Sequence, residues 1–157
     1  MKSLAVLLAL VLPAFARIGE TLAECKSRYG DPIEVDEKTS MNTFRKSGFI
    51  IGCQFFKDRA AAVVMMKEKP AGEFTVLNPE MTQIEIDTIL KANGAGGEWV
   101  NKTPQLELVS KIWVNDTAKR RACYDTIKHT LTIFTDEFAD FSNNAKSEKE
   151  KENLKGF

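Results

Sequence analysis

Cys123 and His129 are the two residues whose chemistry could make this chain an enzyme, because a thiol paired with an imidazole is an effective nucleophile. His129 is the only histidine in the 157-residue sequence. Such a pair needs side chains within hydrogen-bond reach, whereas residues six apart on one extended strand lie about 20 Å apart. Only a turn near residues 126–128 would bring them together. A small secreted thiol-dependent hydrolase is therefore one hypothesis, and a surface histidine with a buried thiol is the other.

The three cysteines, Cys25, Cys53 and Cys123, indicate little other chemistry. No CxxC spacing occurs, which excludes a zinc ribbon and a thioredoxin motif. We expect three buried thiols that behave as small apolar side chains. At most one intramolecular disulfide can form from three cysteines, and the sequence does not say which two residues would pair.

The remaining polar clusters favour surface roles over a cofactor or metal site. Carboxylates gather late in the chain without a DxDxDG loop, so a solvated acidic rim is expected rather than a calcium site. The glycine-rich stretch at residues 93–99 follows a predicted helix, whereas a phosphate-binding loop precedes one. We therefore predict no metal and no cofactor. These carboxylates are Asp116, Asp125, Asp136, Glu137 and Asp140.

Aromatic and basic residues are the better candidates for binding. Large aromatic side chains are frequent at interface hot spots, although a tryptophan on a strand is equally suited to a core. Two basic triplets, at residues 57–59 and 119–121, occupy predicted hairpin tips, where they could meet an acidic partner or lipid head groups, or be ordinary charged turns. The candidate binding residues are Trp99, Trp113, Lys57, Arg59, Lys119 and Arg120.

The first sixteen residues have the layout of a secretory signal peptide. Lys2 is followed by an apolar run and by the small-x-small site at residues 14–16, which predicts cleavage before Arg17. An N-terminal buried helix is the alternative. Lipid attachment is not expected, because the first cysteine follows the acidic Glu24. Cleavage leaves a net charge of −1, so the basic footprint of a nucleic-acid-binding protein is absent. The mature chain is expected to have no transmembrane helix.

Two capping boxes predict two short amphipathic helices. Thr21 with Glu24 opens the first helix, and Gly30 with the following proline ends it. Thr82 with Glu85 opens the second helix 61 residues later, and Gly94 is expected to end it.

Strand patterns follow each helix with the same offset of 61 residues. A short β-prone piece at residues 43–45 and a hairpin at 49–56 and 60–66 follow the first helix. A second hairpin at 109–114 and 121–126 and a last strand at 129–135 follow the second. We expect an α+β fold built from a tandem repeat, in which each unit packs a short helix on antiparallel strands.

These patterns also predict the domain boundaries. The ranges are a signal peptide at 1–16, a first repeat at 17–68, a linker at 69–79, a second repeat at 80–141 and a charged disordered tail at 142–157. Phe138 and Phe141 are expected to cover an edge or a core rim.

The stretch GETLAECKSRYGDP, residues 19–32, resembles the motif of small outer-membrane assembly lipoproteins of the BamE/SmpA type. In that family Gly-x-Thr opens a helix and Gly-x-Pro closes it ahead of a strand meander. The tandem arrangement of residues 19 to about 138 is similar to the architecture of β-lactamase inhibitor protein. Both resemblances imply a non-catalytic exported protein. We therefore predict a binding or scaffolding module of the periplasm or the extracellular space, whose partner is a protein or another envelope component.

Overall fold

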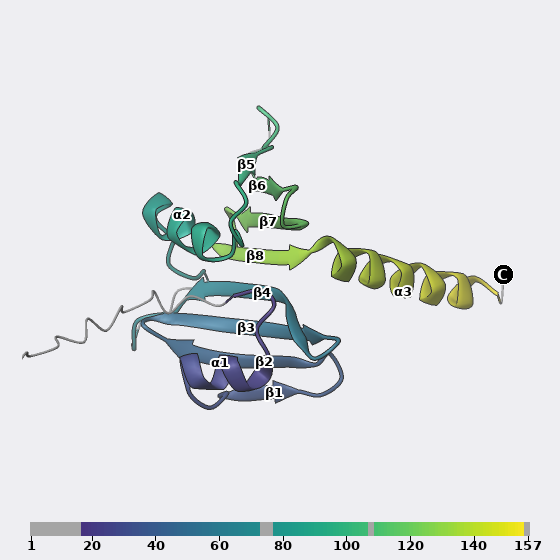
Figure 1. Ribbon diagram of the computed structural model, residues 1–157, viewed down its shortest axis with the longest axis horizontal. Coiled ribbons are helices and arrows are strands. Elements are labelled where there is room, and N and C mark those ends of the chain that lie inside the picture. The colour runs from purple at the N-terminus through teal and green to yellow at the C-terminus, as the bar shows by residue number, and fades with distance from the viewer. Residues whose placement is uncertain (1–16, 73–76, 107–108, 156–157) are drawn as a thin grey trace, which may run out of the picture.

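The computed structural model describes residues 17–72, 77–106 and 109–155, so the predicted signal peptide lies outside the described residues. The described chain forms one antiparallel sheet with three helices (Figure 1). The elements are α1 (Leu22–Tyr29), β1 (Glu34–Asp36), β2 (Met41–Lys46), β3 (Phe49–Phe56), β4 (Arg59–Lys67), α2 (Gln83–Ala92), β5 (Val100–Asn101), β6 (Ser110–Asn115), β7 (Arg120–Asp125), β8 (Thr130–Thr135) and α3 (Asp136–Leu154). The predicted α+β class is confirmed.

The strand order joins two four-stranded meanders through their last strands. The order is β1-β2-β3-β4-β8-β7-β6-β5, so β4 pairs with β8 at the centre. The central pairing aligns Val63 with Ile133 and Met65 with Leu131, and none of these side chains is more than 1% exposed. The hairpin strands and the last strand predicted from the sequence correspond to β3, β4, β6, β7 and β8, whereas the short edge strands β1 and β5 had no clear sequence pattern.

The sheet order changes how the two halves correspond. The offset of 61 residues holds for the helix caps, but it aligns β3 and β4 with β6 and β7. By position relative to the central β4–β8 pairing, β4 corresponds to β8 and β3 corresponds to β7. The first residues of β4 and β8, Arg59 and Thr130, are 71 positions apart in the sequence. The offset fails for the strands because the second half has a longer connection between its helix and its sheet.

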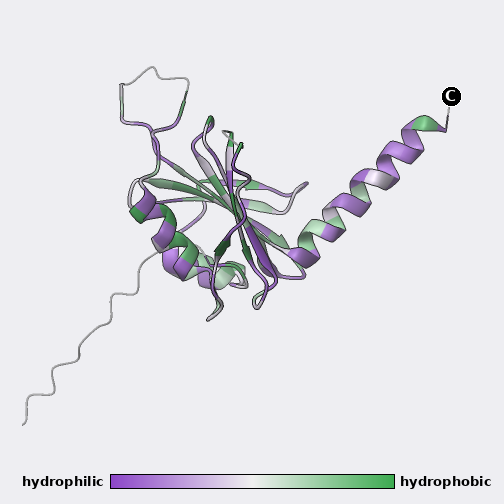
Figure 2. Ribbon diagram, turned by 90° about the horizontal axis from the view of Figure 1, so that it is seen from above, coloured by the Kyte–Doolittle hydropathy of each residue, from purple (hydrophilic) through white to green (hydrophobic). Residues whose placement is uncertain are grey.

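Side chains alternate between a covered face and an open face of the sheet. The covered face has a continuous apolar row that crosses the central pairing: Phe44, Ile51, Met65, Leu131 and Tyr124. Figure 2 shows α1 and α2 on one side of the sheet and α3 leaving on the other side. Both amphipathic helices therefore bury their apolar faces in one shared core.

Both predicted capping boxes are present. The Thr21 hydroxyl accepts a hydrogen bond from the Glu24 amide, and the Glu24 carboxylate accepts one from the Thr21 amide at 2.7 Å. The same pair of contacts joins Thr82 and Glu85. The first helix ends at Gly30, which has a positive φ of 89°. The second helix ends one residue before the predicted Gly94.

The residue that ends the second helix, Asn93, is fully buried and joins three parts of the chain. Its side-chain oxygen accepts a hydrogen bond from the Ile18 amide at 2.9 Å, and its side-chain nitrogen donates to the Ile89 carbonyl. The Arg120 guanidinium donates to the Asn93 carbonyl at 2.6 Å and to the Ile18 carbonyl at 3.4 Å. An asparagine therefore ends α2 where a glycine was expected, because its side chain is needed to fix the segment before α1.

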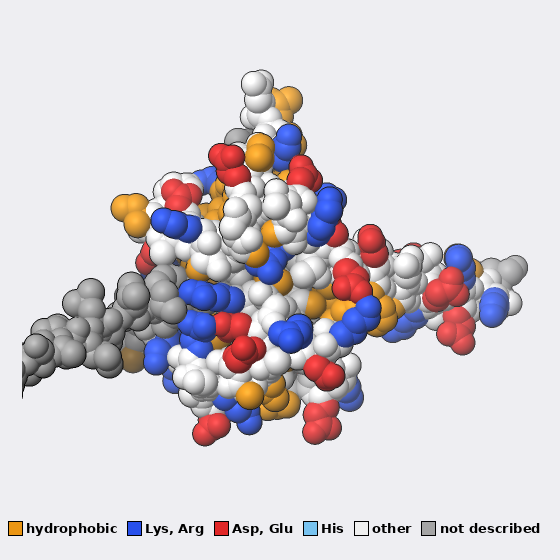
Figure 3. Space-filling view, in the orientation of Figure 1, with side chains coloured by type: hydrophobic (Ala, Val, Ile, Leu, Met, Phe, Trp, Pro, Cys, Tyr) orange, Lys and Arg blue, Asp and Glu red, His pale blue; other side chains and the backbone are white. Residues whose placement is uncertain are grey.

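The predicted disordered tail is helical in the structure. α3 begins directly after β8, extends away from the sheet and has no buried residue (Figure 1). The tail is nevertheless solvated as predicted, and Figure 3 shows acidic and basic side chains interspersed along it. At its base, Phe138 and Phe141 contact the ring of Phe56, as expected for residues that cover an edge. None of the described helices is both long enough and apolar enough to cross a membrane.

We predict similar losses of stability when either cap is removed. Thr21→Ala and Thr82→Ala should each lower the free energy of unfolding by about 0.5–2 kcal/mol, because each leaves helix amides unpaired. Thr88→Ala is the matched control, since the Thr88 hydroxyl only donates to the Ile84 carbonyl within α2. Urea unfolding measures all three variants. A cap variant no less stable than the Thr88→Ala variant would contradict the prediction.

Candidate functional site: a groove beside α1

The two basic triplets lie at the same end of the sheet, where acidic residues of α3 meet them. Lys57 forms an ion pair with Glu137, and the Arg121 Nε lies 2.8 Å from an Asp136 oxygen. Glu137 and Asp136 belong to the late carboxylate cluster that was expected to form a solvated rim. These two carboxylates instead hold two hairpin turns against the base of α3, and Lys119 is the exposed basic residue beside them.

The arginines among the predicted binding residues also bond within the chain. Arg59 donates from Nη1 to the Gly19 carbonyl at 2.8 Å, and Arg120 belongs to the buried network around Asn93. Burial lowers the pKa of Arg120, and its Nε has no hydrogen-bond partner among the described residues. Arg120 therefore holds the fold together and offers little to a partner.

The two tryptophans come together beside α2. Trp113 is only 6% exposed and belongs to the core. Trp99 packs against the same core, and its indole N–H donates to the Leu90 carbonyl at 2.6 Å near the end of α2. They line a small hollow of about 260 Å³ with Leu90. Trp99 is the more exposed of the two tryptophans, although its indole packs against the helix.

Cys123 and His129 have separate surroundings. Cys123 lies on β7 opposite Thr132, on the open face of the sheet. His129 lies in the turn before β8 with a positive φ of 53°, and its Nδ1 is 2.5 Å from the Asn78 carbonyl oxygen. The turn near residues 126–128 exists, but this imidazole nitrogen contacts backbone rather than the thiol. Among the described residues, no group of three or more His, Cys, Asp or Glu side chains is placed to hold a metal ion.

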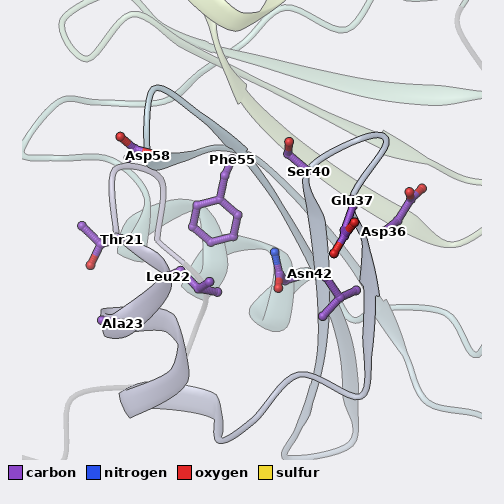
Figure 4. A pocket seen from close by; sticks show the side chains of 10 residues that line it. Thr21, Leu22, Ala23, Asp36, Glu37, Ser40, Asn42, Phe55 and Asp58 are labelled. Carbon is purple, nitrogen blue, oxygen red and sulfur yellow. The ribbon is translucent and has the colours of Figure 1, made fainter.

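A groove of about 580 Å³ lies between the start of α1 and the edge of the first meander (Figure 4). The capping box places the first turn of α1 on one side, and the β1–β2 turn forms the other side. The ends of β2 and β3 form the floor. The lining residues are Thr21, Leu22, Ala23, Val35, Asp36, Glu37, Ser40, Asn42, Phe55 and Asp58.

The rim of this groove is acidic and its interior is largely apolar. Asp36 is fixed by hydrogen bonds from the Thr39 hydroxyl and the Lys38 amide, and these bonds lower the pKa of its carboxyl group. The Glu37 and Asp58 side chains are exposed and form no ion pair or hydrogen bond with another described residue. Three carboxyl groups therefore surround an apolar hollow.

The floor of the groove contains a buried amide without a partner. Asn42 is 8% exposed, and Figure 4 shows its side chain beside Phe55 in the hollow. The other two buried asparagines of the described chain, Asn93 and Asn115, form side-chain hydrogen bonds. Asn42 forms none with any described residue. Among the described residues, the fully buried side-chain atoms without a hydrogen bond belong to Arg17, Tyr29 and Arg120, so the Asn42 amide is reached from the groove and can bond to a ligand there.

Sequence reasoning missed this groove for a physical reason. Its residues come from four separate segments, and none of them forms a motif. The only available signal was the polar Asn42 next to the β-prone residues 43–45, which the alternating pattern places on the covered face with Phe44.

Comparisons with known proteins assign no family. No protein-family model and no curated protein matches the chain. A solved structure of a cysteine-rich secretory protein from Staphylococcus aureus is similar with a TM-score of 0.40 and 10% sequence identity, over 77% of this chain and 45% of that one. The chain thus spans less than half of that protein, and a likeness of this strength assigns neither family nor function.

We predict that Asn42→Leu stabilises the protein. Leucine has a similar branched shape, buries more apolar surface and replaces an amide that forms no hydrogen bond with a described residue, so the free energy of unfolding should rise by about 1 kcal/mol. Asn93→Leu is the matched control and should lower it by about 2–4 kcal/mol, because it removes two side-chain hydrogen bonds in the core and leaves their partners unpaired. Chemical denaturation measures both variants. A loss of stability in Asn42→Leu would show that the amide has a structural partner.

Proposed function

We propose that this protein is an exported, non-catalytic binding module that acts through protein–protein contacts, and that the groove beside α1 is its binding site. The observation that carries the proposal is an apolar groove with an acidic rim, on whose floor the Asn42 side chain forms no hydrogen bond with a described residue. An amide at this depth can pair with the backbone of an extended peptide, while Leu22, Val35 and Phe55 receive an apolar side chain.

The charges of the rim define the class of partner. Asp36, Glu37 and Asp58 favour a segment in which an apolar residue stands next to lysine or arginine. The long stems of these basic residues can cover apolar surface while their charged ends reach the carboxylates. The partner is thus an exposed basic peptide segment of a protein, rather than an acidic partner as the hairpin tips alone suggested.

The proposal includes the tandem repeat and the export route. A common origin of the two halves is supported by the two Thr–Glu capping boxes and by the equal number of strands that each half contributes on its side of the central pairing. Export is supported by the layout of residues 1–16.

Selection from a random peptide library on the purified protein tests the binding site. The selected peptides should share an apolar residue beside lysine or arginine, and their affinity should fall with added salt. Fluorescence anisotropy should show at least about a tenfold loss of affinity for Asn42→Leu, since this loss corresponds to about 1.4 kcal/mol. Asp58→Asn should weaken binding about two- to fivefold, the effect of one exposed charge.

Two features make these variants informative. Asp58 has a φ of 63° in the β3–β4 turn, a conformation that asparagine tolerates well, so Asp58→Asn removes the charge and keeps the turn. Ile84→Gln is the matched control, because Ile84 is 78% exposed on the other capped helix, outside the groove. Peptides that bind the Asn42→Leu and Ile84→Gln variants equally well, or a selection without any consensus, would refute the groove as the binding site.

The export proposal predicts the N-terminus of the mature chain. When the full sequence is expressed in a bacterium with a secretion pathway, the secreted chain should begin at Arg17, as N-terminal sequencing can establish. Ala16→Glu should block cleavage, because the position before the cleaved bond requires a small residue. Retention in the cytoplasm of a chain that still carries the apolar segment would contradict export.

A further inference from the structure

Two of the three cysteines meet in the core beneath α1. Cys25 on the helix and Cys53 on β3 are both 0% exposed and belong to the same cluster of buried side chains. Their thiols are unbridged in the structure and close enough for each to shift the pKa of the other. Two sulfur atoms from segments 28 positions apart in the sequence are therefore neighbours in the fold.

The third cysteine is on the opposite side of the sheet. Cys53 is paired with Asn42 and Val63, in the row of residues that faces the helices. Cys123 is paired with Ile112 and Thr132, in the row that faces away from them. The sheet therefore separates Cys123 from the other two thiols, and only one pairing is geometrically open.

The groups around the two thiols make them unequal. The Glu20 carboxylate lies 4.0 Å from the Cys25 sulfur and is held by the Arg28 guanidinium, whose Nε is 2.9 Å from a Glu20 oxygen. The hydrogen bond from Cys53 lowers the pKa of Cys25, against the opposing effects of burial and of Glu20. The same hydrogen bond, together with burial, raises the pKa of Cys53. Cys25 therefore has the lower thiol pKa of the two.

We propose that Cys25 and Cys53 form a disulfide when the chain meets an oxidising environment, covalently joining α1 to β3 and leaving Cys123 as a free thiol. The oxidant is a small-molecule or protein disulfide, RSSR. The Cys25 thiolate attacks one of its sulfur atoms, releases RS⁻ and forms a mixed disulfide. The Cys53 thiolate then attacks the Cys25 sulfur and releases the second RS⁻. Overall, two cysteine thiols and RSSR give one intramolecular disulfide and two RSH.

The proposed bond would stabilise the half of the molecule that contains the groove. It closes the loop of residues 26–52, and a loop of this length restricts the unfolded chain considerably. For a domain of this size, the melting temperature should rise by roughly 7–14 °C on oxidation. The inference is independent of the proposed binding function, because pairing of the thiols requires no ligand.

The experiment refolds the purified full chain in two buffers, one with excess glutathione disulfide and one with dithiothreitol. Each sample is quenched in acid, alkylated with iodoacetamide under denaturing conditions and mapped by mass spectrometry. The oxidised sample should contain one bridged peptide that joins Cys25 to Cys53, with alkylation only at Cys123. The reduced sample should carry alkylation at all three cysteines and should melt at the lower temperature.

Two variants complete the test. Cys123→Ala should keep both the bridged peptide and the difference in melting temperature, since that thiol takes no part. Cys53→Ala should lose both the bridged peptide and the difference in melting temperature. If this variant does not fold, the comparison of oxidised and reduced wild-type protein still tests the proposal. A folded oxidised protein with three alkylated cysteines, a bridge that includes Cys123, or a lower melting temperature after oxidation would overturn the proposal.

Discussion

The pairing of β4 with β8 is the constraint on which the rest of the structure depends. Each meander alone would have a bare inner strand and only one helix over its apolar face, and an unpaired central strand is a site for aggregation. Antiparallel pairing of the two strands gives the backbone groups of both strand edges hydrogen-bond partners. It also makes one continuous apolar row across the sheet. Because Val63 and Ile133 meet on the covered face, α1 and α2 must lie on that same face and share one core.

Most of the conspicuous polar residues are used to hold the halves in place. Asn93 and Arg120 connect the segment before α1 with the end of α2 and the start of β7. Two carboxylates at the start of α3 bind the turns of two different hairpins, so the base of this exposed helix has a structural role. These pairings occupy most of the basic residues at the hairpin turns, whereas Glu37, Asp58 and Asn42 of the groove beside α1 form no side-chain hydrogen bond with a described residue, which is why that groove is the better binding site.

The groove and the buried thiol pair lie on either side of the same contact between helix and sheet. Cys25 and Cys53 lie two residues beyond Ala23 and two residues before Phe55, which line the groove on α1 and β3. A disulfide between Cys25 and Cys53 would fix the separation of these two walls of the groove.

The sequence by itself determined the elements whose signals are local. Thr21 and Thr82 with their glutamates specify two helix starts, and the apolar strands flanked by polar turns specify the hairpins, because capping and alternation act over a few residues. Only the tertiary structure decided which strands are neighbours, that Asn93 ends α2, that Arg120 is internal and that Cys25 meets Cys53. Asn42 shows the limit most clearly. Its position next to β-prone residues predicts a strand, but whether its amide has a partner depends on side chains from α1 and β3, which only folding brings near.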